Sequence, residues 1–324
     1  MTMAAWRARL HAWQAERGRP AVVFMSNIDD DSVPVLYQCL QAVGRVERLD
    51  LVLATKGGTV TVARRVAMLL REFTSQLAVV VPHEARSAGT LLCLGADELV
   101  LGPLAELSPI DPNLASTWPP PPDGTGSLSA EDIRAFRAMA AEWFGVTSAE
   151  DRLQVLALVA QRVFPGSLAA LYRYDRLCRR TAYELLSRQL PEAAEDARHR
   201  IVDQLVSGYD AHDHVITRAD AVALGLNVAI ASAARDALAW DLLAAHRREL
   251  VDRSSEPGRD GCTGLVTSGG FCARRMKRWD PNPMYPGDPG APEPPMTPRV
   301  AWEIDRPDDP DRPADAMAYA AQEG

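Results

Sequence analysis

The feature that most constrains this chain is a regular alternation of short apolar runs with longer helical patterns. Four apolar runs have the length of buried strands: 21–26, 49–55, 77–82 and 98–102. Residues 32–46 and 61–73 lie between the first three runs and repeat apolar side chains at helical spacing. Strands that alternate with helices in this way form parallel sheets covered on both faces. The sequence therefore predicts an α/β fold with a parallel sheet.

The remaining segments suggest an organisation in three parts. In residues 1–20, Trp6, Leu10 and Trp13 recur at helical spacing, which indicates an N-terminal amphipathic helix. The core spans 21–250 and includes a largely helical insertion at 113–195, which contains a loop rich in Pro, Gly and Ser. Residues 251–324 are dense in Pro and Gly, so we expect an extended or disordered tail.

Composition and charge argue against several functions. The net charge is −8, and no block of Lys or Arg marks a nucleic-acid surface. The five cysteines are scattered without a CxxC pair, which indicates neither a disulfide framework nor a metal site. We find no nucleotide or pyridoxal phosphate motif and expect no cofactor. No apolar run approaches the roughly 18–20 residues of a membrane span. The N-terminus has charges throughout, unlike a signal peptide, so we expect a cytoplasmic protein.

Two junctions between a strand and a helix carry the residues of chemical interest. Gly57 and Gly58 follow the second strand in LVLATKGGTV, and Ser87 follows the third strand in VVVPHEARSAGTLL. The carboxyl ends of parallel strands share one edge of a sheet, so both junctions face the same side. They offer a hydroxyl at a helix N-terminus and backbone N–H donors from a neighbouring loop, as acyl transfer requires. A purely structural role also fits, in which Ser87 caps the helix and the glycines make turns.

Three segments carry a specific signature: LVLATKGGTVTVARRVAMLLRE, VVPHEARSAGTLLCLGADELVLGPLAELSPIDPNL and HDHVITRADAVALGL. With a helical segment at 163–190, they resemble the serine dehydrogenase proteinase family over roughly residues 21–228. That family is grouped with Clp-type proteases and signal peptide peptidase A. The resemblance implies a Clp/crotonase-like spiral fold and serine peptidase activity on a peptide or protein substrate. It also implies that Ser87 is the nucleophile and that Gly57, Gly58 and the Ala88 N–H form the oxyanion hole. Relatives commonly carry proline at the position of Lys56.

The general base is not fixed by this resemblance. Signal peptide peptidases use a lysine after the serine, but no lysine follows Ser87 until Lys277. Clp-type proteases use a histidine after the serine and a later aspartate. Here Asp111, in PIDPNL, stands in place of that histidine, and Asp213 stands in place of the aspartate with a histidine on each side. We infer that His212 is the base and that Asp111 or Asp213 orients it. His214 and Lys56 remain alternatives.

Three functions from different classes are compatible with this sequence. The leading hypothesis is a serine peptidase or related acyl hydrolase. An alternative is a non-catalytic Clp-fold scaffold or peptide-binding protein, and a third is acyl-CoA chemistry on the same spiral fold, which needs no serine at this junction. Relatives with the spiral fold form rings or stacked oligomers, so we expect a homo-oligomer assembled partly through the helical insertion.

Overall fold

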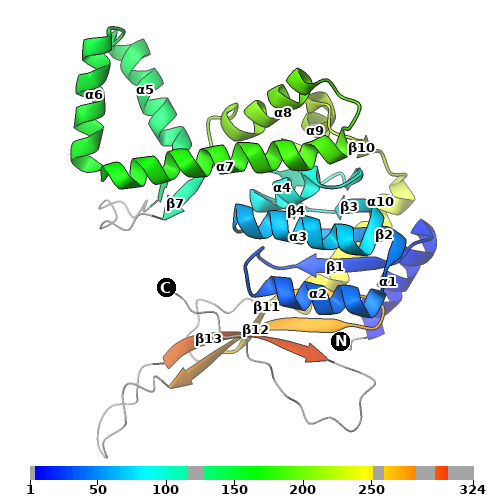
Figure 1. Cartoon of the computed structure of the whole chain (residues 1–324). Helices are drawn as coiled ribbons and strands as arrows, with labels where there is room; N and C mark the ends of the chain where they lie inside the picture. Colours follow the sequence, from blue (N-terminus) through cyan, green and yellow to red (C-terminus); the bar gives the residue numbers. More distant parts are fainter. Residues whose placement is uncertain (1–3, 116–126, 251–258, 282–295, 306–324) are drawn as a thin grey trace, which may run out of the picture.

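The computed structural model describes residues 4–115, 127–250, 259–281 and 296–305 (Figure 1). The helices in this part of the chain are α1 (Ala4–Arg17), α2 (Ser32–Val43), α3 (Val60–Phe73), α4 (Ala88–Leu94), α5 (Ala130–Phe144), α6 (Ala149–Arg162), α7 (Pro165–Gln189), α8 (Glu195–Ser207), α9 (Arg218–Leu224) and α10 (Ala233–Arg247). The strands are β1 (Ala21–Met25), β2 (Val46–Ala54), β3 (Thr74–Val81), β4 (Glu84–Ala85), β5 (Glu98–Leu101), β6 (Glu106–Leu107), β7 (Asn113–Ala115), β8 (Ser127–Ser129), β9 (Ile216–Thr217), β10 (Val228–Ala229), β11 (Gly261–Thr267), β12 (Cys272–Pro281) and β13 (Met296–Asp305).

The main sheet joins a parallel half to an antiparallel half. Its strand order is β10-β5-β3-β2-β1-β11-β12-β13. The pairs from β10 to β1 are parallel, and the pairs from β1 to β13 are antiparallel. The apolar runs expected at 21–26, 49–55, 77–82 and 98–102 correspond to β1, β2, β3 and β5. The predicted α/β class is confirmed.

Each strand of the parallel half presents alternate side chains to two separate cores. On β2, Leu49, Leu51 and Leu53 join the larger core beneath α2, α3, α4 and α7. Val52 and Ala54 point the other way and join a second core with α1 and α10. This alternation follows from the two-residue period of a strand. Burial on both faces explains why the strands appear as continuous apolar runs in the sequence.

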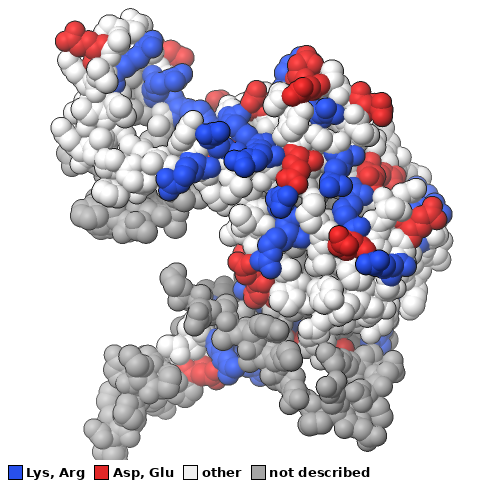
Figure 2. Space-filling model, viewed as in Figure 1, with Lys and Arg blue, Asp and Glu red and all other residues white. Residues whose placement is uncertain are grey.

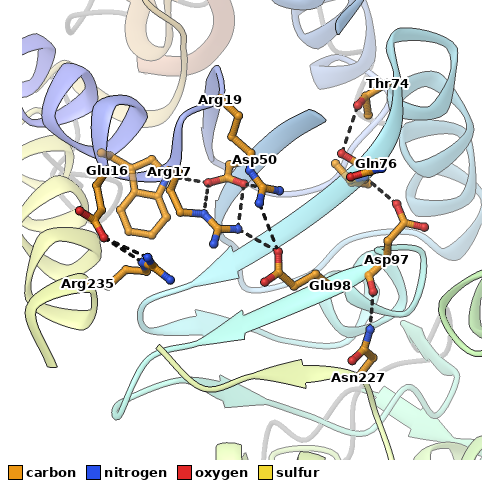
Figure 3. Close-up of polar contacts among 12 residues, drawn as sticks. Glu16, Arg17, Arg19, Asp50, Thr74, Gln76, Asp97, Glu98, Asn227 and Arg235 are labelled. Atoms are coloured by element: carbon orange, nitrogen blue, oxygen red, sulfur yellow. Dashed lines mark hydrogen bonds and ion pairs between the residues drawn. The ribbon is translucent and has the colours of Figure 1, made fainter. Parts of the chain in front are cut away.

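A buried ionic cluster fixes α1 to the amino end of the sheet (Figure 3). Asp50, on β2, has no solvent exposure and accepts hydrogen bonds from Trp13 Nε1 at 2.9 Å and Arg17 Nε at 2.8 Å. Arg17 also reaches Glu98 on β5 at 2.9 Å, and Arg19 lies 3.4 Å from Asp50. Burial raises the pKa of Asp50, and the two guanidinium groups oppose that shift. The helix at the N-terminus is therefore tied to two strands by charge as well as by apolar packing.

The helical insertion extends away from the sheet (Figure 1). We define the helical arm as residues 130–172, which comprise α5, α6 and the first part of α7. Large apolar side chains are exposed along it, among them Phe136, Trp143, Phe144, Leu153, Leu156 and Phe164. Much of the surface of the arm carries no charge (white in Figure 2). Within the described ranges, no single helix has the length and apolar character needed to cross a membrane. Helices α6 and α7 pass that test only as a pair bent by 106°.

The segment after residue 250 differs from the expected extended or disordered tail. Its described residues form β11, β12 and β13, and β11 pairs directly with β1. Leu265 and Val266 on β11 and Trp302 on β13 are buried. The expectation is therefore corrected for 259–281 and 296–305, because these strands bury apolar side chains that a Pro-rich composition obscured. Residues 251–258, 282–295 and 306–324 lie outside the described residues, as does the predicted loop rich in Pro, Gly and Ser, which spans 116–126.

Candidate active site

The two junctions singled out in the sequence lie side by side at the carboxyl end of the parallel strands. The chain leaves β2 through Gly57 and Gly58 into α3, and it leaves β3 through β4 and Ser87 into α4. Backbone hydrogen bonds join the two crossings, because Thr55 N–H donates to Glu84 O at 3.0 Å and Arg86 N–H donates to Thr55 O at 3.1 Å. The glycine loop and Ser87 are thus held together by main-chain contacts.

Gly58 sits where no side chain fits. Its φ is +150°, and a Cβ built on it would lie 2.2 Å from the Ile28 carbonyl oxygen. The close approach arises because Thr59 N–H donates to Ile28 O at 3.2 Å and Ile28 N–H donates to Gly57 O at 2.8 Å. Only glycine accommodates both the positive φ and this contact. The glycine loop is consequently fixed against the loop that follows β1.

Ser87 has a strained backbone at the start of α4. Its φ of 50° and ψ of −112° make it the only non-glycine residue with positive φ in the described part of the chain. Its side chain makes no capping hydrogen bond to α4, so the simple capping role does not hold in this structure. The Ser87 N–H donates to Ser108 Oγ at 2.8 Å, and Ser108 is anchored by Thr90. Strain of this kind is concentrated at functional sites.

The backbone donors near Ser87 are not equivalent. The Gly57 N–H donates to Thr55 Oγ1 at 3.1 Å, so it is already occupied. The N–H groups of Gly58 and Ala88 have no hydrogen-bond acceptor among the described residues. Of the three predicted oxyanion donors, Gly58 and Ala88 therefore retain free N–H groups, and the Gly57 N–H serves to shape the loop.

His212 and Asp111 form a hydrogen-bonded pair beside this junction. His212 Nδ1 lies 2.7 Å from Asp111 Oδ1. The Asp111 side chain is 4% exposed, whereas the His212 side chain is 41% exposed. The hydrogen bond from Asp111 raises the pKa of His212, and burial opposes that shift. Because Nδ1 is engaged with the carboxylate, Nε2 is the imidazole nitrogen left to exchange a proton.

A single pocket connects these groups. It has a volume of about 250 Å³, and its wall includes Ser87, Asp111, His212, Gly58 and Lys56. The wall also includes the apolar side chains of Val60, Leu91, Ile110 and Pro112. A hydroxyl, an imidazole–carboxylate pair and a free backbone N–H around one small space form the set that acyl transfer uses.

The other predicted candidates occupy different positions. Asp213 is exposed and is not part of the pocket wall, although its charge adds to the raised pKa of His212. His214 stacks on Tyr209 with a ring separation of 4.4 Å. Lys56 is exposed at the pocket. Of the two carboxylates proposed to orient His212, Asp111 makes the hydrogen bond.

Sequence reasoning missed two members of the wall. Tyr174 and Cys178 reach the pocket from α7, one helical turn apart. Burial raises the pKa of the Cys178 thiol to about 12, so this thiol stays protonated. Tyr174 Oη accepts the Val60 N–H at 3.4 Å. Their i, i+4 spacing was visible in the sequence, but nothing there indicated that α7 covers the pocket. Among the described residues, no three His, Cys, Asp or Glu side chains gather as a metal site.

Two uncharacterized proteins are similar in sequence to parts of this chain. An uncharacterized protein of Methanocaldococcus jannaschii is 28% identical over 211 residues, covering 65% of this chain and 63% of that protein. A second uncharacterized protein of the same organism is 35% identical over 66 residues, covering 20% of this chain and 23% of that protein. The chain thus spans less than two thirds of the length of either relative.

A family model matches the part of the chain that carries the two junctions. The matching residues are 17–122, and the family is described as ClpP-like SDH-type serine proteinase. The match includes Gly58, Ser87 and Asp111, whereas His212, Tyr174 and Cys178 lie outside it. Over residues 17–122, the chain is similar to ClpP-like SDH-type serine proteinases, and the resemblance expected from the sequence is confirmed.

Proposed function

We propose that this protein is a serine peptidase-like hydrolase in which Ser87 is the nucleophile. The hydrogen bond of 2.7 Å between His212 and Asp111, on the wall of the pocket that Ser87 also lines, is the observation that carries the proposal. The match of residues 17–122 to a serine proteinase family adds independent support. Peptides or protein segments are the proposed substrates.

The proposed reaction begins with transfer of the Ser87 hydroxyl proton to His212 Nε2. Ser87 Oγ then attacks the scissile carbonyl, and the resulting oxyanion accepts hydrogen bonds from the N–H groups of Gly58 and Ala88. Collapse of this intermediate breaks the C–N bond, and His212 returns the proton to the departing amine. Water repeats the sequence to release the acyl group from Ser87. Asp111 holds the imidazole tautomer and stabilises its positive charge.

The raised pKa of His212 fits this role. A base must be neutral to accept a proton, and its basicity increases as its pKa rises. The Asp111 hydrogen bond supplies both the orientation and the increase. Lys56 is the weaker candidate because a second side chain would have to orient it, and in the described part of the chain it has no ion-pair partner.

Labelling with a fluorophosphonate probe tests the proposal. Such probes phosphonylate an activated serine, so the wild type should be labelled, and Ser87→Ala should abolish the adduct. His212→Ala should slow labelling by about 10²-fold or more, because unassisted serine is a poor nucleophile. Ser75→Ala and His11→Ala serve as matched controls at exposed positions and should label like the wild type. Equal labelling of wild type and Ser87→Ala would favour the scaffold alternative.

The same proposal includes self-association through the helical arm. Its exposed side chains, such as Trp143 at 75% and Phe164 at 76%, cannot be buried by the arm itself. A second copy that presents the same arm would cover them in a symmetric contact. Light scattering should give more than one chain per particle at micromolar concentration, and Trp143→Glu with Phe144→Glu should shift the particle toward the monomer. A wild-type monomer under these conditions would contradict this part.

A further inference from the structure

Lys56 places a positive charge at the pocket that Ser87 and His212 line. It shares the pocket wall with Ser87 and His212 and is exposed to solvent. The described residues provide no ion pair or hydrogen bond for its ammonium group. The first turn of α3, which follows it, contains no acidic residue. The charge at this position is therefore available to a molecule that enters the pocket.

Three carboxylates of the pocket wall and of the loop that contacts Gly58 are already engaged. Asp111 is hydrogen-bonded to His212. Asp30 and Asp31, on the loop that contacts Gly58, pair with Arg65 at 2.5 Å and Arg275 at 2.9 Å. The nearby guanidinium of Arg86 is neutralised in turn by Glu84 and Glu106. Among the described residues that line the pocket, Lys56 is thus a cation without an ion pair.

Tyr174 adds a second donor to the same space. Its hydroxyl oxygen accepts the Val60 N–H, which leaves the hydroxyl proton without an acceptor among the described residues. Burial raises the pKa of Tyr174, so the hydroxyl keeps that proton at neutral pH. An ammonium group and a phenolic O–H border the same pocket, and both can donate hydrogen bonds to a carboxylate.

The same pocket wall includes the apolar side chains of Val60, Leu91 and Ile110. Resting on the hydrolase function proposed above, we propose that the pocket binds an acidic side chain, Glu or Asp, of the substrate residue that precedes the scissile bond. The methylene groups of that side chain pack against the apolar wall. Its carboxylate pairs with Lys56 and accepts a hydrogen bond from the Tyr174 hydroxyl.

Matched peptides test this specificity. The substrates are fluorogenic peptides that differ only in Glu, Gln or Lys before the scissile bond, and Gln has the shape of Glu without its charge. For the wild type, kcat/KM should favour Glu over Gln about fivefold, the effect of one partly exposed ion pair. The difference should appear in KM and should shrink at high salt, because salt screens an exposed pair.

Substitutions of Lys56 and Tyr174 test whether these residues cause the preference for Glu. Lys56→Gln should bring the Glu and Gln peptides to the same kcat/KM, and Lys56→Glu should favour the Lys peptide. Tyr174→Phe should weaken the Glu preference while the Gln peptide is less affected. Lys277→Gln, which replaces the only other lysine, and Tyr172→Phe, on the exposed face of α7, are the controls and should retain the wild-type preference.

Binding to Ser87→Ala separates this inference from the proposed reaction. Titration of that variant with the Glu and Gln peptides should show tighter binding of Glu, and Lys56→Gln in the same background should remove the difference. Labelling of Ser87 without any preference for Glu overturns the inference and leaves the hydrolase intact. Preferential binding of Glu without labelling overturns the hydrolase and supports only the preference of the pocket for an acidic side chain. Absence of both labelling and preference overturns the two together.

Discussion

His212 and Asp111 are 101 positions apart in the chain, yet His212 Nδ1 lies 2.7 Å from Asp111 Oδ1. Two short strands bring their loops together, because β6 pairs with β9 through Glu106 opposite Thr217 and Leu107 opposite Ile216. A further backbone hydrogen bond runs from Ile110 N–H to Leu205 O at 2.9 Å. The pair therefore depends on the pairing of two loops rather than on either loop alone.

The reaction should depend on pH because the hydrogen bond from Asp111 raises the pKa of His212. His212 must be neutral to accept a proton, so kcat/KM should rise as the pH passes its raised pKa, above the ordinary value of 6.5. Asp111→Asn removes the main cause of the increase, so the rising limb should move to lower pH while turnover falls about 10²- to 10⁴-fold. Ester hydrolysis between pH 5 and 9 measures both effects. His214→Ala should keep the wild-type profile, and an unshifted limb in Asp111→Asn would assign the titration to another group.

Gly58→Ala should damage both the fold and the site. A Cβ here would lie 2.2 Å from the Ile28 carbonyl oxygen, and that oxygen belongs to the backbone and cannot rotate away. We expect a lower melting temperature and loss of fluorophosphonate labelling. Gly145→Ala is the matched control, since its φ is +69° and nothing lies within 4 Å of the added Cβ. Gly145→Ala should lower the free energy of unfolding by about 1 kcal/mol and leave labelling intact. Equal melting temperatures for the two variants would contradict the expected clash.

His246 should make the protein less stable in acid. It is fully buried, and its Nδ1 and Nε2 are held by Leu242 O at 2.8 Å and Thr267 Oγ1 at 2.9 Å. Burial lowers its pKa from 6.5 to about 4. The unfolded chain then binds the proton more readily, so this contribution to stability is complete above about pH 6.5 and is lost as the pH falls toward 4.

The shift in the pKa of His246 corresponds to about 3 kcal/mol of the free energy of unfolding. Urea unfolding at pH 7, 5.5 and 4.5 measures it. His246→Gln, which keeps a donor and an acceptor, should reduce the pH dependence, whereas the exposed His11→Gln should not. The same pH dependence in all three proteins would show that other groups cause it.

Asp50→Ala should be among the most destabilising single changes. It leaves the buried Arg17 guanidinium and the Trp13 N–H without their shared acceptor. Removal of one partner from a buried ion pair costs about 3–5 kcal/mol. Asp30→Ala breaks an ion pair with Arg65 in which the carboxylate is 78% exposed. This substitution should lower the free energy of unfolding by at most about 1 kcal/mol. Chemical denaturation of both variants gives the comparison, and similar losses would refute the distinction.

The strands near the C-terminus should be essential for folding. A chain that stops after Arg278 lacks β13 and the end of β12, and it loses Trp302, which is 3% exposed. Loss of that one side chain from the core removes about 2–3 kcal/mol, before the loss of strand pairing. We expect a marked fall in melting temperature or an insoluble product. A chain that stops after Asp305 keeps every described strand and is the control, and equal melting temperatures would show that β13 is dispensable.

The parallel half and the two junctions could be predicted because their signals are local. Strands buried on both faces leave apolar runs in the sequence, and Gly58 and Ser87 stand where those runs meet helical patterns. By contrast, β12 carries Arg274, Arg275, Lys277 and Arg278. These charged residues interrupt the apolar pattern by which a strand is predicted from sequence. Its partner strands, and not its own composition, hold it in the sheet.

The rest of the pocket depends on contacts between distant segments. Asp111 and Asp213 were equally plausible partners of His212 in the sequence, and only the pairing of β6 with β9 separates them. Tyr174 and Cys178 lie on a helix whose pattern predicts burial but not what it covers. The free N–H groups of Gly58 and Ala88 follow from a hydrogen-bond arrangement that no spacing encodes. Their catalytic roles, with those of Ser87 and His212, remain predictions.

The pairing of β1 with β11 has a consequence for synthesis. β1 consists of five buried residues near the start of the chain, and its second neighbour is formed by residues 261–267. On the ribosome, β2, β3 and β5 can join β1 early, but its other edge stays open until β11 emerges. An open apolar edge invites pairing with other nascent chains. A polypeptide that ends before residue 261 leaves this edge of β1 unpaired, so it should aggregate more readily than one that includes β11.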